Sequence, residues 1–287
     1  MRGSSPVGGG KGRTDHPQDK EQKRHHGAGP GILKVVGLGP GHPDYLAPAA
    51  QRALTEAEVI VGYKRYIGLL DPHLLTGKKV ISTGMRGEME RCEAALAAAL
   101  GGKKTVLVSS GDPGIYAMAG LVFEIMESGG LLDRIEVEII PGLPALSAAA
   151  ALLGAPLMHD FAVVSLSDLM TPWDRIRQRV VAALEADFVL VIYNPRSKKR
   201  RWQIREVLDL VTKYRGITAP VGIVRNAARN GQEARVVYSG DVNETVIDML
   251  TIVVVGNSRT RIMGKRMVTP RGYMEKYGMT GGKDGLP

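Results

Sequence analysis

The sequence predicts an α/β fold made of two α/β domains. Its 287 residues suffice for about two domains, and 44% of them are hydrophobic, as in a globular protein. Short β-branched runs alternate with segments of helical spacing, which is typical of a parallel sheet with right-handed crossovers. Gly, Pro, Asn and Asp gather where the runs stop, and these residues favour turns.

The first domain is predicted over residues 31–157. An aliphatic run at 32–37 predicts a strand, and the segment at 47–57 predicts the helix after it. A short strand from residue 59 leads into an aromatic and basic loop, and a strand at 79–82 precedes an Ala-rich helix at 88–100. The strand at 106–108 passes through a tight turn directly into a helix. A strand at 137–140 and a helix of small residues ending at 153 complete the domain.

The second domain is predicted over residues 158–277. Aliphatic runs at 161–165 and 188–192 predict strands, and segments at 173–184 and 202–214 predict the helices that follow them. Three further strands, at 221–224, 235–238 and 251–256, stand too close together for intervening helices, so we expect a mixed sheet. Residues 1–30 predict a disordered basic tail, since they lack the aliphatic residues for a core. Residues 278–287 are expected to form a flexible C-terminus.

The composition favours an anionic partner and a reducing compartment. Lys and Arg number 38 against 29 Asp and Glu, a net charge of +9. A small polyanionic substrate explains this surplus better than nucleic acid, because no nucleic-acid-binding motif occurs and aromatic residues are only 5%. The single Cys92 excludes an intramolecular disulfide and a cysteine zinc cluster, so we expect a cytoplasmic protein. We expect neither a membrane span nor a signal peptide, because no apolar run is long enough.

The turn at 110–114 is the first candidate binding element. It follows a predicted strand, where ligands bind in open parallel sheets, and its glycines let a ligand approach the main chain. The helix after it would offer free N–H groups, and Asp112 places a carboxylate at the rim. An ordinary strand-to-helix turn explains the same residues equally well.

The loop at 37–44 contains GxGxG but does not predict a dinucleotide site. Pro40 and Pro43 remove backbone donors for a pyrophosphate, and His42 stands where the GxGxxG fingerprint has its third glycine. An acid for the ribose is also missing, so a nicotinamide-dependent oxidoreductase is disfavoured. In one interpretation His42 and Asp44 face a cleft. In the other, His42 is a solvated side chain and Asp44 is a helix N-cap.

An ordered set of motifs, each weak alone, then identifies a resemblance. The motifs are VGYKRY at 61–66, STGM at 82–85, ERC at 90–92, SSGDPGIYAMAG at 109–120, YNPRS at 193–197, DMLT at 248–251 with GNS at 256–258, and TPRGY at 269–273. With them, residues 32–277 resemble the tetrapyrrole methylases, enzymes that use S-adenosylmethionine (SAM) to methylate uroporphyrinogen and the precorrins.

The resemblance implies a homodimer of two-domain α/β subunits of the class III SAM-dependent type, with SAM and the active site in the cleft between the domains. It implies no protein-bound metal and no nucleic-acid or membrane partner. Carried over residue by residue, it implies that SAM contacts Pro40, Ser110, Gly111, Asp112, Ile115, Tyr116, Pro144, Ala145, Asn194, Ala227 and Thr251. The family more often has Asp at His42 and Ser or Thr at Pro144, so main-chain contact is expected at Pro144.

The resemblance is strongest to the branch that methylates C17 of precorrin-3B or cobalt-precorrin-3, with contraction of the corrin ring, in cobalamin biosynthesis. Methylation of another precorrin carbon is the alternative. Ring contraction requires proton transfers, and the candidate groups are His42, Asp44 and Asp112, whereas His159 is expected to be structural.

The substrate of these enzymes is a tetrapyrrole with many carboxylates. We expect basic side chains to clamp these groups through charge-assisted hydrogen bonds. For each such side chain a solvated surface base is an equally good interpretation. The candidates are Arg65, Arg86, Arg196, Lys198, Arg225 and Arg229.

Overall fold

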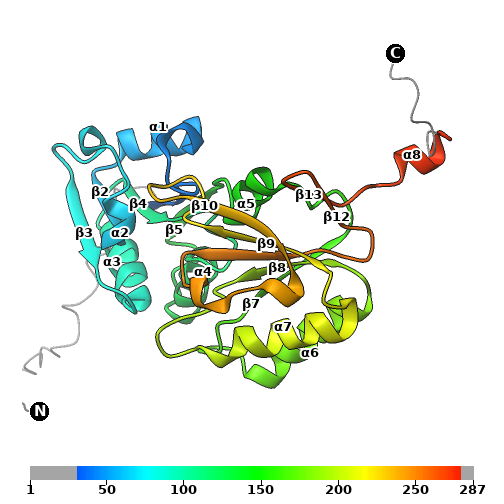
Figure 1. Cartoon of the computed structure of the whole chain (residues 1–287). Helices are drawn as coiled ribbons and strands as arrows, with labels where there is room; N and C mark the ends of the chain where they lie inside the picture. Colours follow the sequence, from blue (N-terminus) through cyan, green and yellow to red (C-terminus); the bar gives the residue numbers. More distant parts are fainter. Residues whose placement is uncertain (1–30, 279–287) are drawn as a thin grey trace, which may run out of the picture.

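The computed structural model describes residues 31–278 (Figure 1). The predicted tail at 1–30, and all but the first residue of the predicted C-terminal segment at 278–287, lie outside the described residues. The first sheet is parallel and has the strand order β3-β2-β4-β1-β5, which confirms the parallel prediction. Its strands are β1 (Gly31–Gly37), β2 (Val59–Tyr63), β3 (Lys79–Thr83), β4 (Thr105–Ser109) and β5 (Ile135–Ile140).

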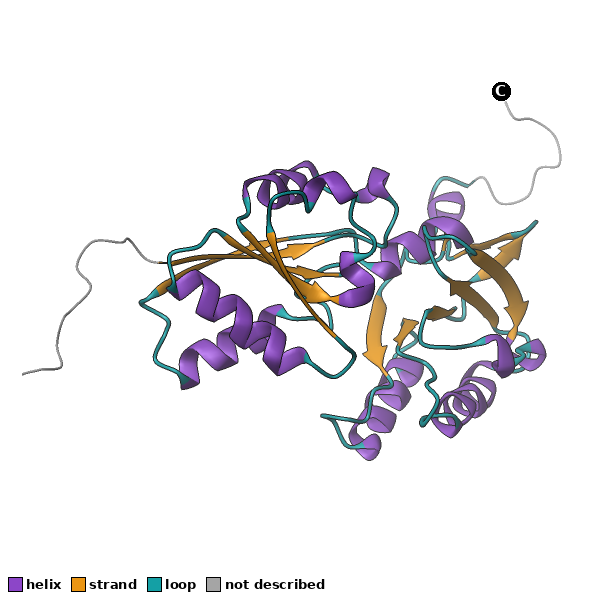
Figure 2. Cartoon of the chain, turned by 90° about the vertical axis from the view of Figure 1, so that its left-hand side faces the viewer, coloured by secondary structure: helices purple, strands orange, loops and turns teal. Residues whose placement is uncertain are grey.

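Helices cover both faces of this sheet (Figure 2). On one face, α3 (Glu88–Leu100) and α4 (Ala119–Ser128) pack against the side chains that include Val35 and Leu107. On the other face, α1 (Pro48–Glu56) and the short α2 (Lys64–Ile67) pack against neighbours of opposite orientation, such as Val36 and Val106. The internal strands β2 and β4 are buried on both faces because both faces are covered, whereas the edge strands β3 and β5 are partly exposed. Cys92, a residue of α3, is fully buried against the sheet.

The strand order has a topological switch point between β1 and β4. The chain leaves β1 toward α1 on one face of the sheet, and it leaves the adjacent β4 toward α4 on the other face. Loops that diverge in this way leave room at the carboxyl ends of the strands, where open α/β sheets bind ligands. The two candidate loops, 37–44 and 110–116, are those that follow β1 and β4.

The second sheet is mixed, as predicted, with the order β10-β9-β11-β8-β7. Only β7 and β8 pair in parallel, and the remaining neighbours are antiparallel. Helices α6 (Trp173–Glu185) and α7 (Trp202–Arg215) pack on one face, and α5 (Ala145–Leu153) packs on the other. The strands are β7 (Phe161–Ser165), β8 (Val189–Tyr193), β9 (Pro220–Arg225), β10 (Glu233–Tyr238) and β11 (Thr251–Val255).

A small third sheet joins distant segments. Its strands β12 (Arg261–Met263) and β13 (Arg266–Val268) form a hairpin, and β13 pairs with β6 (Gly154–Ala155). The short helix α8 (Tyr273–Lys276) follows. These strands were not predicted, because two or three residues are too few for a hydrophobic period. The domain boundary at 157/158 stays a prediction, although α5, on its N-terminal side, packs on the second sheet.

The remaining predicted helices and strands are confirmed to within a few residues, with two corrections. Residues 64–67 form α2 instead of a loop. The second correction concerns the central segment, because α4 begins only at Ala119 and leaves an irregular loop at 110–118 after β4. No helix within residues 31–278 has the length and apolarity that crossing a bilayer requires.

Candidate functional site

The loops after β1, β4 and β5 meet main chain to main chain at one edge of the first sheet. Gly39 and Gly111 form an antiparallel bridge, with Gly111 N donating to Gly39 O at 2.7 Å. A Cβ on Gly37 would lie 2.6 Å from both Gly111 O and Gly142 N, and one on Gly142 would collide with Gly111 O. Only glycine lets the three backbones approach so closely. We call Gly37, Gly39, Gly111 and Gly142 the glycine junction.

Asp112 fastens this junction. Its Oδ1 accepts a hydrogen bond from Gly114 N at 2.8 Å, and its Oδ2 accepts one from Gly142 N at 3.2 Å. The carboxylate therefore turns its own loop and ties it to the loop after β5. Asp112 does not cap the following helix, because α4 begins at Ala119 with Met118 as its N-cap.

The helix that begins at the junction is α5, not α4. Gly111 is left-handed at φ +67°, and a Cβ on it would lie 3.8 Å from Ala145 N at the start of α5. Pro144 is the N-cap residue and provides no side-chain hydrogen bond. The next amide, Leu146 N, donates to Tyr193 Oη at 2.9 Å. This contact connects the junction to the end of β8 in the second sheet.

Tyr116 makes a second connection between the two sheets. It has a left-handed backbone, with φ +51°, and its Oη donates to Val163 O of β7 at 3.0 Å. Its ring centroid lies 5.4 Å from that of Tyr193. Burial raises the pKa of both phenols, so both stay protonated near neutral pH. The pair therefore offers neutral hydroxyl groups and aromatic surface beside the glycine junction.

Arg229 makes a third connection. It lies in the loop after β9, and its Nη2 donates to Ser110 Oγ at 2.6 Å while its Nε donates to Pro40 O. Two residues of this loop, Asn226 and Ala228, have φ values of +51° and +53°. Alanine pays about 1–2 kcal/mol in this conformation, whereas asparagine tolerates it better. Hydrogen bonds from Arg229 N to Asn226 O and from Ala228 N to Gln232 Oε1 hold the turn.

Arg225 and Thr251 share one acid. Arg225 Nε donates to Asp248 Oδ2 at 2.9 Å, and Thr251 Oγ1 donates to Asp248 Oδ1 at 3.0 Å. Burial acts to raise the pKa of Asp248, but the hydrogen bonds from Arg225, Leu250 N and Thr251 outweigh it and lower the pKa. Arg225 and Thr251 are also paired across β9 and β11. Ala227 lies two residues after Arg225, in the same turn as Arg229.

Sequence reasoning missed the residues that hold Asn194. Asn194 is left-handed at φ +50°, its Nδ2 donates to Ser165 Oγ at 2.9 Å, and its carbonyl accepts from Arg200 Nη2 at 2.7 Å. Arg200 is 6% exposed and also faces Asp168, 3.7 Å from Nη1. It stands in a basic run that includes Lys198 and Arg201, and the run gives no sign of which base turns inward.

The predicted SAM residues therefore stand on loops that contact one another. The contacts through the glycine junction, Tyr193, Arg229 and Asp248 connect the loops after β1, β4, β5, β8 and β9 with the start of β11. Ile115 lies in the loop of Asp112 and Tyr116. Their role in SAM binding stays a prediction. The set on these loops is Pro40, Ser110, Gly111, Asp112, Ile115, Tyr116, Pro144, Ala145, Asn194, Ala227 and Thr251.

The candidate acid–base groups differ in surroundings. Asp112 has both oxygens engaged by backbone N–H groups. His42 and Asp44 are exposed, with Nδ1 of the histidine 3.4 Å from Asp44 Oδ2. His42 is the N-cap of the short 3₁₀ helix Pro43–Tyr45 and accepts from Asp44 N, so the prediction of Asp44 as the cap is wrong. His159 is half exposed and lies 3.7 Å from Asp160.

The predicted carboxylate clamp separates into two groups. Arg196 donates to Glu244 O at 2.7 Å and Arg225 pairs with Asp248. Arg229 joins the two units, by which we mean the first sheet and the second sheet, each with the loops at its strand ends. The other three side chains are exposed, and within residues 31–278 none of them has a protein hydrogen-bond partner. These exposed bases are Arg65, Arg86 and Lys198.

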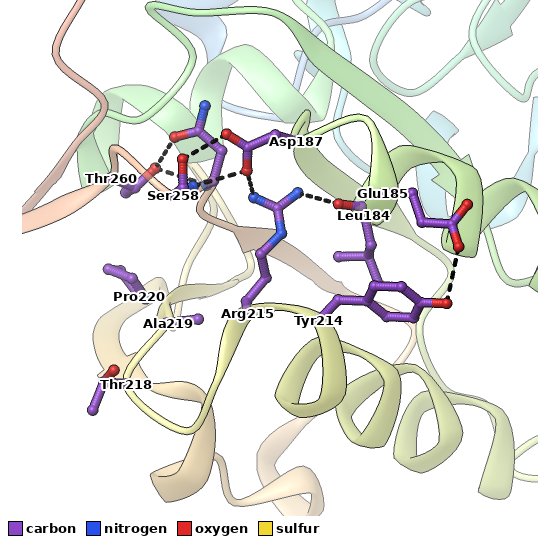
Figure 3. A pocket seen from close by; sticks show the side chains of 11 residues that line it. Leu184, Glu185, Asp187, Tyr214, Arg215, Thr218, Ala219, Pro220, Ser258 and Thr260 are labelled. Atoms are coloured by element: carbon purple, nitrogen blue, oxygen red, sulfur yellow. Dashed lines mark hydrogen bonds and ion pairs between the residues drawn. The ribbon is translucent and has the colours of Figure 1, made fainter.

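A separate pocket lies in the second sheet at the ends of the strands opposite to the candidate loops (Figure 3). It is lined near the start of β9 and the end of β11, whereas the candidate loops follow the end of β9 and precede the start of β11. Its polar groups are paired with one another, since Arg215 and Ser258 both bond to Asp187. Within residues 31–278 no cluster of three His, Cys, Asp or Glu side chains is arranged to hold a metal ion.

Comparisons with known proteins extend these observations. The family of Tetrapyrrole (Corrin/Porphyrin) Methylases matches residues 33–243. A probable cobalt-factor III C(17)-methyltransferase of Salmonella typhimurium is 47% identical over 243 residues, which cover 84% of this chain and 99% of that protein. A cobalt-factor III methyltransferase of Priestia megaterium is 45% identical over 249 residues, 86% of this chain. The chain spans about half of that longer relative, 46% of its length.

Solved structures with a similar fold include one that is 39% identical to this chain. It is the crystal structure of the methyltransferase CobJ, with a TM-score of 0.80. The match covers 84% of this chain and all of that one. The two-unit α/β architecture is thus that of a solved methyltransferase.

Proposed function

The chain belongs to the tetrapyrrole methylase family, and from this premise we propose that it is a SAM-dependent C-methyltransferase of cobalamin biosynthesis. Its substrate is precorrin-3B or its cobalt-containing counterpart, and the methyl group goes to C17 with contraction of the ring. Two findings support this: a relative named as a probable C(17)-methyltransferase is 47% identical, and the loops predicted to hold SAM contact one another. The second finding carries the assignment of the site.

The residues at the glycine junction fit SAM. SAM is a nucleoside joined through a sulfonium to an amino acid chain, and close main-chain contact can hold it; the junction offers backbone that no Cβ obstructs. A Cβ on Gly111 would occupy the space in front of the α5 N-terminus. Tyr116 and Tyr193 add neutral hydroxyl groups and aromatic faces. We assign the cofactor contacts to the turn at 110–116, to Pro144 and Ala145, and to Asn194, Ala227 and Thr251, with Pro40 at the rim.

The chemistry asks mainly for positioning. SAM supplies an activated methyl group when bound, so the protein must align the acceptor carbon with it and keep water away. The glycine junction fixes the loops of the first unit, and Tyr116 and Arg229 fix them against the second unit. These contacts preorganise the site before substrate arrives, so less ordering remains to be done on binding.

Proton transfer during ring contraction is assigned to His42 and Asp44. Their side chains are exposed on the loop after β1, the loop that also carries Pro40. Asp112 is less suited, because both of its oxygens already accept N–H groups of the main chain. We therefore give Asp112 the role of holding the loops together at the SAM site.

The exposed bases Arg65, Arg86 and Lys198 are assigned to the substrate carboxylates. Arg65 lies in α2 directly after β2, and Arg86 and Lys198 lie in the loops after β3 and β8, at the same carboxyl ends of the strands as the SAM residues. We further propose a cytoplasmic homodimer. Two adjacent side chains in the loop after β7 support association, since Leu169 and Met170 are 76% and 95% exposed.

Calorimetric titration with S-adenosylhomocysteine, the demethylated product of SAM, tests the proposal. We expect one site per chain with a dissociation constant in the micromolar range, and no binding of NAD or of duplex DNA. Methyl transfer from labelled SAM to precorrin-3B and to its cobalt form, followed by mass spectrometry, then tests the substrate. Binding of NAD alone would contradict the methylase assignment, and methylation elsewhere than at C17 would contradict the site of transfer.

A further inference from the structure

Arg229 is the side chain that joins the second unit to both candidate loops of the first. Its Nε donates to the carbonyl of Pro40, in the loop after β1, and its Nη2 donates to Ser110 Oγ, in the loop after β4, at 2.6 Å. These partners precede it by 189 and 119 residues. One planar guanidinium thus spans the point at which the two loops diverge toward opposite faces of the sheet.

The surroundings of Arg229 are built around this position. Gly41 lies against the side chain, and a Cβ there would lie 2.8 Å from Arg229 Nε and 3.0 Å from its Cγ. The turn that presents Arg229 contains two left-handed residues, Asn226 and Ala228, and is held by hydrogen bonds within the loop. A strained turn persists only where its surroundings demand it, which points to a function for the side chain that it presents.

Within the described chain no carboxylate pairs with this guanidinium, and burial lowers its pKa. Arginine remains protonated nevertheless. A half-buried cation without an acid is costly unless its N–H groups are satisfied. The backbone carbonyl and the hydroxyl that satisfy two of them belong to residues assigned to SAM. The ordinary interpretation of a solvated surface base therefore does not hold for Arg229.

From this geometry we infer that Arg229 is a positioning residue for the cofactor, which it serves by holding Pro40 and Ser110 in register from the opposite unit. This inference rests on the proposed function, and it replaces the prediction of Arg229 as a member of the substrate clamp. The planar fork suits the task, because two donors in fixed geometry set the separation of two acceptors. Lysine would supply the charge through one flexible donor.

The test compares R229A, R229K and the control R261A in titrations with S-adenosylhomocysteine. Arg261 is an exposed base in β12, so R261A removes the same charge outside these loops. We expect R229A to bind about tenfold or more weakly, the usual effect of losing a hydrogen bond from a charged group. R229K should recover part of the affinity, and R261A should match the wild type. Full recovery in R229K would show that charge, not the fork, matters and would overturn the inference.

A second readout does not depend on the cofactor. Hydrogen exchange in the ligand-free proteins should be faster in R229A than in the wild type at residues 38–46 and 110–118, with α6 and α7 unchanged. Exchange that rises throughout the chain would indicate general destabilisation and would overturn the assignment. A double-mutant cycle of R229A with S110A should be non-additive, because both variants remove the same contact. Additive losses would count against a contact that acts through Ser110.

The outcomes separate this inference from the proposed function. If the wild type fails to bind S-adenosylhomocysteine, the proposed function is wrong and the role of Arg229 falls with it. If the wild type binds and R229A binds equally well, the proposed function stands and only the role of Arg229 is wrong. A loss of tetrapyrrole affinity in R229A, with unchanged cofactor affinity, would return Arg229 to the clamp.

Discussion

Arg225 and Asp248 form an ion pair whose nitrogen and oxygen lie 2.9 Å apart, at the point where β9 ends and β11 is about to begin. The pair fixes the loop of Ala227 to the start of β11 through Thr251, which bonds to the same carboxylate. Arg225 therefore has a partner within its own unit. This relationship makes Arg225 part of the frame around the cofactor residues, and its contact with the substrate stays a prediction.

The pair predicts a stability that depends on acid pH. Because the pKa of Asp248 is lower in the folded state, its contribution is present above the unfolded pKa and is lost as pH falls through the folded pKa. D248N should lower the free energy of unfolding by about 1 kcal/mol at pH 7, a figure reduced for solvent screening. Urea unfolding between pH 3 and pH 7 measures this, with the exposed D133N as the control. An equal deficit at both ends of the range would contradict the assignment.

The glycine junction predicts a steric requirement that differs between two glycines. A Cβ on Gly142 would collide with Gly111 O and lie 2.8 Å from the carbonyl carbon of Gly37, whereas one on Gly120 in α4 meets nothing within 4 Å. G142A should lose at least about 2 kcal/mol of stability through overpacking. G120A should be neutral or gain up to about 1 kcal/mol from its better helix propensity. Thermal unfolding of both variants decides the matter, and similar midpoints would refute the close approach.

Arg200 predicts a loss that charge alone does not repair. R200A leaves the carbonyl of Asn194 without the Arg200 donor and leaves the carboxylate of Asp168 with Gln203 alone, at a cost of roughly 2–3 kcal/mol. R200K should recover less than half, since lysine cannot direct two donors at separate acceptors. Urea unfolding measures the cost, and titration with S-adenosylhomocysteine tests whether Asn194 has shifted. Complete rescue by R200K would show that the paired geometry is unimportant.

The exposed bases predict a change that affects one ligand only. R65A/R86A should raise the KM for the tetrapyrrole about tenfold, through lost charge-assisted hydrogen bonds, and leave the affinity for S-adenosylhomocysteine unchanged. The double variant R261A/K265A removes the same charge from the β12–β13 hairpin and should change neither value. Steady-state kinetics at saturating SAM provides the comparison. An equal rise in KM in both double variants would indicate a general effect of net charge.

Local patterns were enough to predict most of the framework. The β-branched runs and the turn residues after them mark β1, β4 and β8 with little ambiguity, because a strand and its end are properties of a few neighbouring residues. The same holds for the parallel first sheet, which follows from the alternation of strands and helices. The start of α4 was misplaced because the apolar residues from Ile115 onward fit helical spacing without forming a helix.

The contacts that assemble the site were beyond such reasoning. Nothing near Arg229 in sequence indicates that its partners are Pro40 and Ser110, and nothing in the basic run at 198–201 marks Arg200 as the buried member. Arg225 was expected to clamp a substrate carboxylate, and nothing near it in sequence indicates its pairing with Asp248. Pairings over long separations depend on how the loops of two sheets meet, and a single sequence contains no local signal for that.

Cys92 gives the molecule a built-in reporter of its own opening. Burial raises the pKa of this thiol to about 12, and its side chain is fully enclosed between α3 and the first sheet. Alkylating reagents and peroxides react with the thiolate, so the reaction requires that α3 separate from the strands beneath it. Within the chain this is the single sulfhydryl. Its rate of chemical labelling therefore measures how often the first unit opens around α3, with no competing signal from the second unit.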